Sequence, residues 1–293
     1  MRTPRLVLTS GLAVVLASAI AACAPEKDDS TVASSSAPSA SAPNCAPAQL
    51  KTLSAGKLTF GTDDPVYPPW FADNKPESGQ GFESAIAYAV ATKLGYAKDQ
   101  VVWTRVTFNN AIAPGPKKYD VDINEFSITE DRKKAVDFSS PYYDVTQAVI
   151  TTKTSKIAGA KSIADLKKAK LGAQVGTTSL RAICEVIKPS TDQQVFNNTD
   201  DAKKALQNGQ IDGLVVDLPT AFYITSAELD NGVIVGQLPQ PSGTPEQFGL
   251  VLDKGSPLTT CVSLAVDELR TGGDLKRIET QYLAGVAGAP VLS

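Results

Sequence analysis

The sequence of 293 residues contains no histidine. Without histidine, the Ser-His-Asp and Cys-His arrangements of nucleophilic catalysis are excluded, and so are the commonest zinc sites. No other tuned acid–base pair is visible in the sequence. We therefore expect no catalytic residue, no metal and no cofactor.

An excess of positive charge is also lacking. The chain has 28 Lys and Arg residues against 31 Asp and Glu residues, which gives a formal net charge of −3. Because no basic stretch stands out to neutralise phosphates, nucleic acid is not an expected partner. The length is sufficient for two lobes, each with its own hydrophobic core.

The N-terminus lacks an apolar run as long as the roughly 20 residues that a transmembrane helix needs. Arg2 and Arg5 precede an almost unbroken apolar stretch over residues 6–20, and small residues follow it. This layout is typical of a secretory signal peptide, which we place at residues 1–22. A single transmembrane anchor is the alternative.

Cys23 follows this segment directly. The quartet Ile20-Ala21-Ala22-Cys23 resembles the lipobox of bacterial lipoproteins, in which the cysteine is lipidated and becomes the mature N-terminus. Residues 24–44 are mostly Ser, Ala and Pro, a composition that cannot bury enough apolar surface to offset its ordering entropy. We therefore expect residues 23–48 to be a lipid-anchored tether. The protein would then lie on the extracellular or periplasmic face of the cell membrane.

Three further cysteines, Cys45, Cys184 and Cys261, would occupy an oxidising compartment. Three pairings are possible. We favour a Cys45–Cys261 disulfide, which would join the start of the folded domain to its last long amphipathic segment. Three buried thiols are the alternative.

Short β-rich segments alternate with helix-forming segments from residue 58 onward. Strands are predicted at residues 58–62, 101–108, 120–126, 148–152, 170–175, 213–216 and 247–252. Helices are predicted at residues 84–94, 162–169, 180–187, 200–207 and 258–282, the last one broken at Gly272 and Gly273. The alternation predicts an α/β fold with two largely parallel sheets, each covered on both faces.

Ligands of open α/β sheets bind at the carboxyl ends of the strands, which selects the loops at 63–71, 124–132, 176–179 and 217–219. In the second loop, Thr129 is a good helix N-cap, and Arg132 falls in the first helical turn near Ser127. A guanidinium group can donate two parallel hydrogen bonds to a carboxylate. Arg132 is therefore a candidate carboxylate clamp, and a surface arginine in an exposed ion pair is the alternative.

The other loops supply complementary groups. The turn at Thr177 and Thr178 offers backbone N–H groups and hydroxyls for an anion, and Asp217 offers a carboxylate for a cation. Flat apolar walls are expected from Tyr67, Trp70 and Phe108. Together these features fit an α-amino acid. The simpler alternatives are helix caps for the threonines, helix initiation for the aspartate, and core packing for the aromatic residues.

The most specific feature is the segment SITEDRKKAVDFSSPYY at residues 127–143. It resembles the signature of the family 3 periplasmic-type solute-binding proteins, which are the polar amino acid receptors of ABC importers. The segments GTTS (176–179) and GQIDGLVVD (209–217) match that family in order and spacing, and the resemblance extends over residues 57–283. The motif GFE at 81–83 also matches, with Ala85 in place of a usual second acidic residue.

The resemblance implies a two-lobe, type II periplasmic-binding-protein-like fold, in which two crossing segments form a hinge. We place the crossings near residues 147–152 and 241–248. Lobe 1 is then expected to combine residues 49–148 with 249–293, and lobe 2 to comprise residues 149–248. The resemblance further implies a monomer that closes on an amino acid and delivers it to a membrane permease.

Matching positions imply roles for the residues that would hold the α-carbon end of the ligand. Arg132 is expected to bind the carboxylate with help from Ser127 and Thr178. Asp217 is expected to pair with the α-ammonium group.

The ligand side chain is expected to lie between Tyr67 and Phe108, with Asp63 or Asp64 near its tip. Glu125 stands where the family usually has Gly or Ser. With the two aspartates, this glutamate favours a basic or hydrogen-bonding side chain.

Two other functions are compatible with the same fold. Some members of the fold dehydrate cyclic dienyl acids of the cyclohexadienyl type, and Glu125 is a candidate general acid for that chemistry. A lipoprotein that senses a ligand and signals to another membrane protein is the third reading. We favour the transport receptor over the enzyme because no second acid–base group is visible and because a lipid tether suits a receptor.

Overall fold

The computed structural model describes residues 43–240, 244–286 and 288–293. The predicted signal peptide at 1–22, the predicted lipidation site Cys23 and the predicted tether up to residue 42 lie outside the described residues. Within the described ranges, no helix is both long and apolar enough to cross a membrane.

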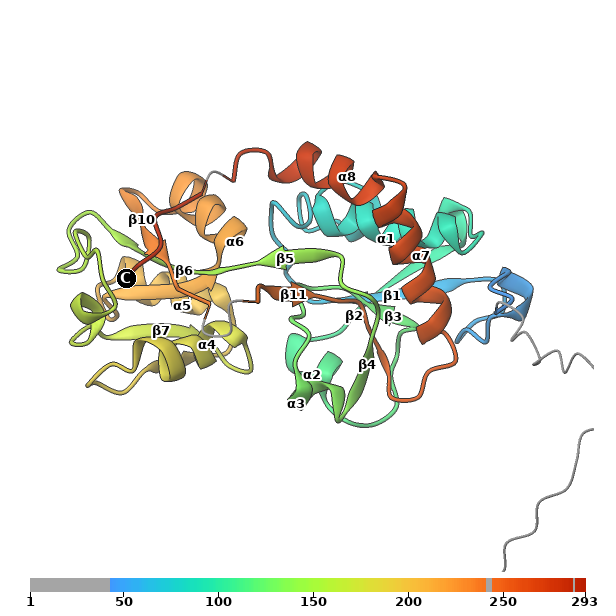
Figure 1. Ribbon diagram of the computed structural model, residues 1–293, viewed down its shortest axis with the longest axis horizontal. Coiled ribbons are helices and arrows are strands. Elements are labelled where there is room, and N and C mark those ends of the chain that lie inside the picture. The colour runs from blue at the N-terminus through green and yellow to red at the C-terminus, as the bar shows by residue number, and fades with distance from the viewer. Residues whose placement is uncertain (1–42, 241–243, 287) are drawn as a thin grey trace, which may run out of the picture. The chain divides into compact units, whose positions relative to one another are not determined.

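A five-stranded sheet forms the centre of the first lobe, in the order β2-β1-β3-β12-β4 (Figure 1). Its strands are β1 (Leu58–Thr62), β2 (Val101–Arg105), β3 (Val121–Asp122), β4 (Val136–Phe138) and β12 (Val251–Asp253). β1 is parallel to β2 and β3, whereas β12 is antiparallel to β3 and β4. The prediction of a largely parallel sheet is therefore wrong here. The reason is that β12 enters from the hinge rather than through the helical crossover that a parallel strand requires.

The second lobe has a sheet of the same size and the same mixed character. Its strand order is β10-β6-β9-β7-β8, with β6 (Gln147–Thr152), β7 (Leu171–Gln174), β8 (Gln194–Phe196), β9 (Gly213–Asp217) and β10 (Gly232–Gln237). β7 is parallel to β8 and β9, and β6 is antiparallel to β9 and β10. Again the antiparallel strand, β6, arrives directly from the other lobe.

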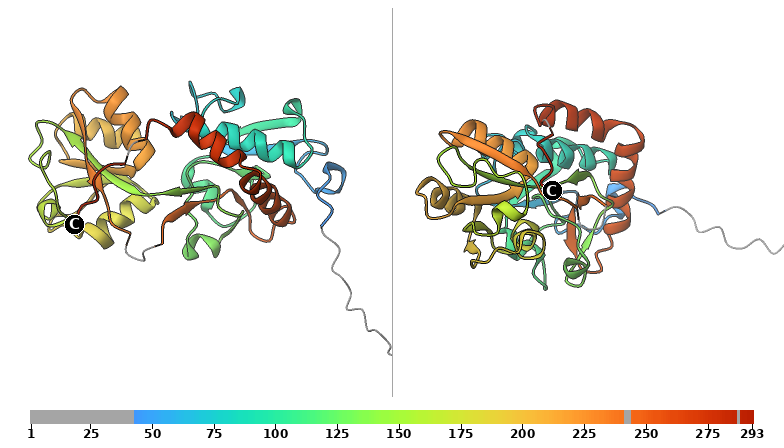
Figure 2. Two further views of the ribbon diagram at one scale, coloured as in Figure 1. Left: turned by 45° about the horizontal axis from the view of Figure 1, so that its top comes forward. Right: turned by 60° about the vertical axis from the view of Figure 1, so that its left-hand side comes forward.

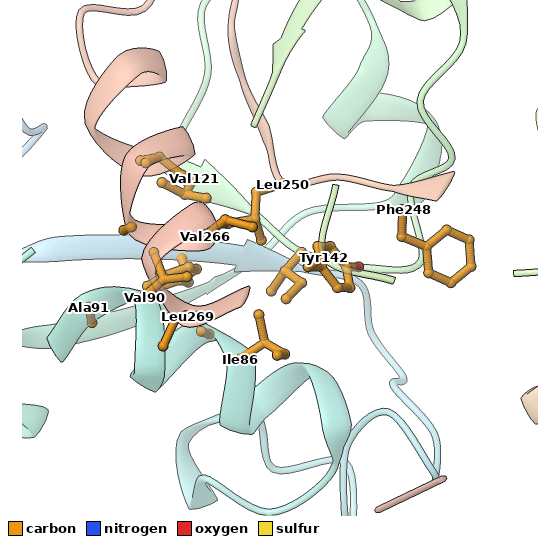
Figure 3. Close-up of a cluster of buried hydrophobic side chains, with 14 of the residues drawn as sticks. Ile86, Val90, Ala91, Val121, Tyr142, Phe248, Leu250, Val266 and Leu269 are labelled. Atoms are coloured by element: carbon orange, nitrogen blue, oxygen red, sulfur yellow. The ribbon is translucent and has the colours of Figure 1, made fainter. Parts of the chain in front are cut away.

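Three helices pack against one another on one side of the first sheet (Figure 1). They are α1 (Phe82–Lys93), α7 (Thr259–Thr271) and α8 (Asp274–Leu283). Their apolar side chains, such as Ile86 and Val266, are buried together with Val121 of β3 and with Leu250, which directly precedes β12 (Figure 3). This core fixes the position of the strand ends that carry the cavity residues of the first lobe.

The predicted break at Gly272 and Gly273 is confirmed. Gly273 has a φ of 80°, a left-handed conformation that glycine adopts without steric cost. The chain therefore ends α7 at Thr271 and begins α8 at Asp274, with only the two glycines between the helices.

Two short helices of the first lobe, α2 (Phe108–Ile112) and α3 (Glu130–Lys133), lie in the segments that follow β2 and β3. In the second lobe, α4 (Thr178–Ala182) continues as the π-helical turn η5 (Ile183–Ile187), and α6 (Leu218–Tyr223) continues as η6 (Ile224–Glu228). α5 (Thr199–Gln207) agrees with the predicted helix at 200–207. The helix predicted at 162–169 is only a 3-10 turn, η4 (Ala164–Leu166).

The two sheets are joined by a two-stranded ribbon of β5 (Tyr143–Val145) and β11 (Glu246–Phe248). Figure 1 and the left view of Figure 2 show this ribbon running between the sheets. The predicted crossing near 147–152 is therefore wrong by a few residues, since that segment is β6 of the second sheet. The strand predicted at 247–252 is divided into β11 and β12, because the chain leaves the hinge ribbon and joins the first sheet within this segment.

The last residues of the chain return to the second lobe. Val291 forms a parallel bridge with Gln237, and Leu292 is buried in the cluster that includes Val235 and Leu238. Figure 1 shows the C-terminus beside β10. The expectation that residues 249–293 all belong to lobe 1 is therefore wrong for this final segment.

Cys45 and Cys261 form a disulfide, which confirms the favoured pairing. Cys184 is exposed and its thiol is free. The alternative of three buried thiols is therefore wrong.

Candidate functional site

A cavity of about 300 Å³ lies among loops that follow strands of both sheets. All of the predicted ligand-binding residues except Trp70 and Ser127 line it, namely Asp63, Asp64, Tyr67, Phe108, Glu125, Arg132, Thr177, Thr178 and Asp217. The strand ends of the two sheets thus bring together residues that are far apart in the sequence.

Arg132 is held in a fixed orientation by its own loop. Thr129 caps α3 by accepting a hydrogen bond from the backbone N–H of Arg132 at 3.2 Å, which confirms the predicted cap. The guanidinium group donates to the carbonyl of Ser127 at 2.7 Å and to the carbonyl of Gly176 at 3.0 Å. It also lies over the ring of Phe108, 5.3 Å from the centroid. Because Gly176 belongs to the second lobe, Arg132 bridges the two lobes.

Among the described residues, Arg132 forms no ion pair. Its residue exposure is only 9 %, so the alternative of an exposed surface arginine is wrong. Burial lowers its pKa to about 10, which still leaves the group charged at neutral pH. A buried cation without a carboxylate partner is costly, and an anion bound in the adjoining cavity would offset that cost.

Asp217 stands at the carboxyl end of β9. Its carboxylate does not cap α6, so simple helix initiation does not account for it. Instead, Oδ1 accepts a hydrogen bond of 2.6 Å from the Nε2 amide of Gln147. Burial, and then the nearby Glu246 carboxylate, raise the pKa of Asp217 well above its usual range. A cationic ligand group would lower that pKa and restore the charge.

Glu125 points to the same cavity from the first lobe. Its Oε2 accepts a hydrogen bond of 3.1 Å from the hydroxyl of Thr220, a second-lobe residue. Its backbone has a φ of 55°, a left-handed conformation that is uncommon for residues other than glycine. Burial raises its pKa well above the ordinary range, and the Glu83 and Asp217 carboxyls add to the effect.

The backbone of Glu125 is held by Glu83, the first acidic residue of α1. The N–H of Glu125 donates to Oε1 of Glu83 at 2.7 Å, and the hydroxyl of Tyr142 donates to the same oxygen. Glu83 is fully buried, and its Oε2 has no hydrogen-bond partner among the described residues. The GFE motif at residues 81–83 is the sequence feature from which this contact of Glu83 with the Glu125 backbone could have been predicted.

Trp70 is a core residue rather than a wall of the cavity. It is 1 % exposed and makes edge contacts with Phe82 and Tyr143. The core-packing alternative is therefore correct for Trp70. Its indole N–H nevertheless donates to the hydroxyl of Thr220 at 2.8 Å. It thereby orients the same hydroxyl that donates to Glu125.

Ser127 lies just behind the cavity and is 1 % exposed. Its Oγ is 3.1 Å from the Oγ1 of Thr178, and both hydroxyls donate to Oε1 of Glu246. Glu246 was not predicted from the sequence. Its place beside Ser127 depends on the backbone bridge between Ser127 and Phe248, which joins segments about 120 positions apart.

Thr177 and Tyr67 have structural partners as well as a place in the lining. Thr177 caps α4 by accepting from the N–H of Leu180 at 3.1 Å, so the helix-cap alternative is correct for this residue. The hydroxyl of Tyr67 donates to Oδ2 of Asp200 at 2.6 Å. Because Asp200 is in α5 of the second lobe, this contact spans the cavity.

Asp63 also lines the cavity, in the part that we expect to hold the tip of the ligand side chain. Its carboxylate accepts from the backbone N–H of Asp64 at 2.8 Å and of Phe108 at 3.2 Å. Burial raises its pKa. No group of three or more His, Cys, Asp or Glu side chains in the described ranges is placed to hold a metal ion.

Comparison with known proteins gives a consistent result. Residues 58–285 match the family described as bacterial extracellular solute-binding proteins, family 3. The L-arginine-binding protein of Pseudomonas aeruginosa is 28 % identical over 239 residues, which cover 77 % of this chain and 90 % of that protein. The ABC transporter glutamine-binding protein GlnH of Bacillus subtilis is 30 % identical and is matched over 78 % of this chain and 81 % of its own length.

Solved structures give the same fold. An ancestral arginine-binding protein bound to arginine superposes with a TM-score of 0.64 at 32 % identity, covering 78 % of this chain and 98 % of the other. An ancestral amino acid-binding protein described as a precursor of cyclohexadienyl dehydratase has a TM-score of 0.62 at 29 % identity, covering 78 % of this chain and 95 % of the other. The two-lobe, type II periplasmic-binding-protein-like fold is thereby confirmed.

Proposed function

Because the chain belongs to family 3 of the bacterial extracellular solute-binding proteins, we propose that it captures a polar amino acid between its two lobes for an ABC importer. In this proposal Arg132 binds the α-carboxylate, Asp217 binds the α-ammonium group, and the lobes close because these groups come from different lobes. A permease would then receive the closed form.

The observation that carries the proposal is the buried guanidinium group of Arg132, which forms no ion pair with any residue that the structure describes. It adjoins a cavity whose other side presents the Asp217 carboxylate. A zwitterion provides an anion for the guanidinium group and a cation for the carboxylate. Neutral or purely anionic solutes would leave one of the two groups unsatisfied.

We propose a basic or amide side chain for the ligand. The carboxyl groups of Asp63, Asp64 and Glu125 face the cavity in addition to Asp217, and Arg132 is the only basic residue among the described residues of the lining. The arginine-binding and glutamine-binding relatives support this choice. The lipid on Cys23, a tether that ends before Cys45, the monomeric state and the remaining lobe boundaries are part of the same proposal, since the disulfide of Cys45 places that residue in the folded domain.

A thermal-shift screen of the purified domain against all twenty amino acids tests the proposal. A ligand present at 100 times its Kd stabilises the folded state by about 2.7 kcal/mol. We expect Arg, Lys, His or Gln to raise the Tm. A panel in which Asp and Glu outcompete these four would contradict the assigned side chain, and no shift with any amino acid would contradict the function.

Replacing Arg132 tests the assigned carboxylate clamp. R132A leaves the ligand carboxylate desolvated and unpaired, so its binding is expected to weaken by about 2–5 kcal/mol in calorimetry. R181A is a matched control, because Arg181 is exposed and lies 3.9 Å from Glu185 in a surface ion pair. Equal affinity of R132A and the wild type would show that the clamp is misassigned.

A dehydratase is the second candidate, and Glu125 is the observation in its favour. A buried carboxyl group with a raised pKa suits a general acid, and one similar solved structure is described as a dehydratase precursor. The two curated relatives named above are binding proteins. Turnover of a cyclohexadienyl acid that is lost in E125Q would favour the enzyme over the receptor. A ligand-sensing lipoprotein is a third possibility. Cross-linking in the membrane distinguishes it from a transport receptor, because a sensor would be linked to a membrane protein other than a permease.

A further inference from the structure

We propose that the segment after α8 is a strap that limits how far the two lobes can separate. The strap comprises residues 284–286 and 288–293, which follow α8 of the first lobe and reach β10 of the second. The match to the family ends at residue 285, so most of the strap lies outside the part of the chain that matches. In Figure 1 the segment directly after α8 lies apart from the ribbon of β5 and β11. The strap therefore connects the lobes separately from that ribbon.

The second-lobe end of the strap is anchored on β10. The N–H of Gln237 donates to the carbonyl of Pro290 at 2.8 Å, and the N–H of Leu292 donates to the carbonyl of Gln237 at 2.9 Å. Leu292 is 1 % exposed and belongs to a buried cluster of the second lobe. A Cβ added at Gly236 would lie 2.7 Å from the Pro290 carbonyl oxygen, so only glycine lets the strap approach this closely. The strap is thus a packed part of the second lobe.

Gln237 also joins the strap to the hinge. Its Nε2 amide donates to the carbonyl of Ala289 at 2.5 Å, and its Oε1 accepts from the hydroxyl of Thr146 at 2.6 Å. Thr146 is the single residue between hinge strand β5 and strand β6. One side chain therefore holds the strap against the point where the hinge ribbon enters the second lobe.

The first-lobe end of the strap is anchored at the end of α8. Leu283 is buried in the core of the first lobe, and its carbonyl accepts from the backbone N–H of Val286 at 2.9 Å. The side chain of Val286 packs against the buried clusters of both lobes. Separation of the lobes must therefore remove Val286 from one of these clusters.

The short chain between the two anchors limits the range of opening. Ala289 follows Leu283 by six positions, and six residues span at most about 20 Å when fully extended. Opening that moves the anchors further apart must break one of them. In the described arrangement all of these contacts are made, so the restriction falls on the open arrangements. A restriction that removes conformations from the open form raises the relative population of the closed form.

Lengthening the strap tests the proposal without removing either anchor. The residues Gly-Ser-Gly-Ser-Gly-Ser are inserted after Gly288, where an added Cβ has no neighbour within 4 Å. Opening is measured in the ligand-free protein as the distance between two spin labels. One label is on Cys184, the exposed free thiol of the second lobe, and the other is on K93C, at an exposed position of α1. The distance distribution is expected to become about twice as wide, because the insertion adds up to about 20 Å of reach.

A matched control and a second variant accompany the insertion. The same residues inserted after Gly159 are the control, because Gly159 also faces open space but lies between β6 and β7 within one lobe. L292S loosens the second-lobe anchor and is expected to widen the distribution too. Combined with the insertion after Gly288, L292S is expected to widen it no further, because both changes act through the strap. Unchanged widths in the Gly288 insertion and in L292S would overturn the proposal, and so would equal widening by the Gly159 insertion.

The distance measurement needs no ligand, so the strap can be tested apart from the proposed function. If an amino acid binds, the insertion after Gly288 is expected to raise its Kd about threefold, because more of the protein is then open. A Kd equal to that of the wild type would overturn the claim that the strap favours the closed form. If no amino acid binds, the proposed function fails, and the ligand-free distances still decide whether the strap limits opening.

Discussion

Arg132 and Glu83 are both buried charged residues, but their surroundings differ. The Arg132 guanidinium group has two carbonyl acceptors and an aromatic ring beside it. Its orientation is therefore fixed, and none of these neighbours neutralises its positive charge. Glu83 has two donors on one oxygen and none on the other. The first residue is suited to bind a ligand, and the second is suited to position Glu125.

Glu83 also predicts a pH dependence of stability. Burial raises its pKa from 4.5 to about 7. A carboxyl group with a raised folded-state pKa contributes stability below its unfolded pKa, and this contribution is lost as the pH rises from about 4.5 to about 7. E83Q removes this titration. The free energy of unfolding of E83Q minus that of the wild type is therefore expected to rise between pH 5 and pH 7 and to level off above.

Urea unfolding at pH 5, 6, 7 and 8 measures this difference, with a slope of at most about 1.4 kcal/mol per pH unit. E77Q is the control, because Glu77 is exposed and precedes the same helix. A difference between E83Q and the wild type that does not change with pH would show that the carboxyl of Glu83 does not titrate in this range.

Among the secondary structure elements, α7 has a covalent as well as a packing role. Cys261 in its first turn is bonded to Cys45, 216 positions earlier. Apolar residues of α7 are buried against α1 and the first sheet. The helix that closes the first lobe is thus joined to the segment with which the folded domain begins.

Removing the disulfide is expected to lower stability without affecting binding. The double variant C45A/C261A frees a long loop in the unfolded chain, so the free energy of unfolding is expected to fall by about 2–5 kcal/mol. Neither cysteine lines the cavity, and the Kd is expected to stay the same. C184A, which removes the exposed free thiol, is the control and is expected to unfold like the wild type. Equal stability of all three proteins would contradict the prediction.

In the molecule as a whole, contacts between the lobes surround the cavity. Tyr67 bonds Asp200, Arg132 bonds Gly176, and the hydroxyl of Thr220 bonds Glu125. Each of these pairs joins one residue from each lobe. The described arrangement is therefore a closed one, in which the ligand position is covered on both sides.

Y67F tests the contribution of one of these contacts to closure. Loss of the hydrogen bond to the Asp200 carboxylate is expected to raise the ligand Kd about tenfold. The change is expected mainly in the dissociation rate, because the contact forms only after closure. Stopped-flow fluorescence measures both rates. Y88F is the control, since the Tyr88 hydroxyl bonds Glu77 within one lobe. An unchanged dissociation rate in Y67F would argue against this role.

The sequence predicted most of the features that depend on neighbouring residues. The Thr129 cap, the glycine break before α8, the strand β1 and the helix α5 are local, because short-range hydrogen bonds and backbone preferences determine them. The strands β4, β5, β8 and β10 were not predicted. Three of them, β4, β5 and β8, have only three residues each, too few to show an alternating pattern.

The sequence by itself predicted most of the residues that line the cavity. Arg132, Asp217 and Glu125 fall at strand ends, and strand ends of open α/β sheets meet ligands. Only the tertiary structure decided that Trp70 belongs to the core, that β6 and β12 run antiparallel to their neighbours, and that Glu246 contacts the two hydroxyls. These outcomes depend on pairings between distant segments.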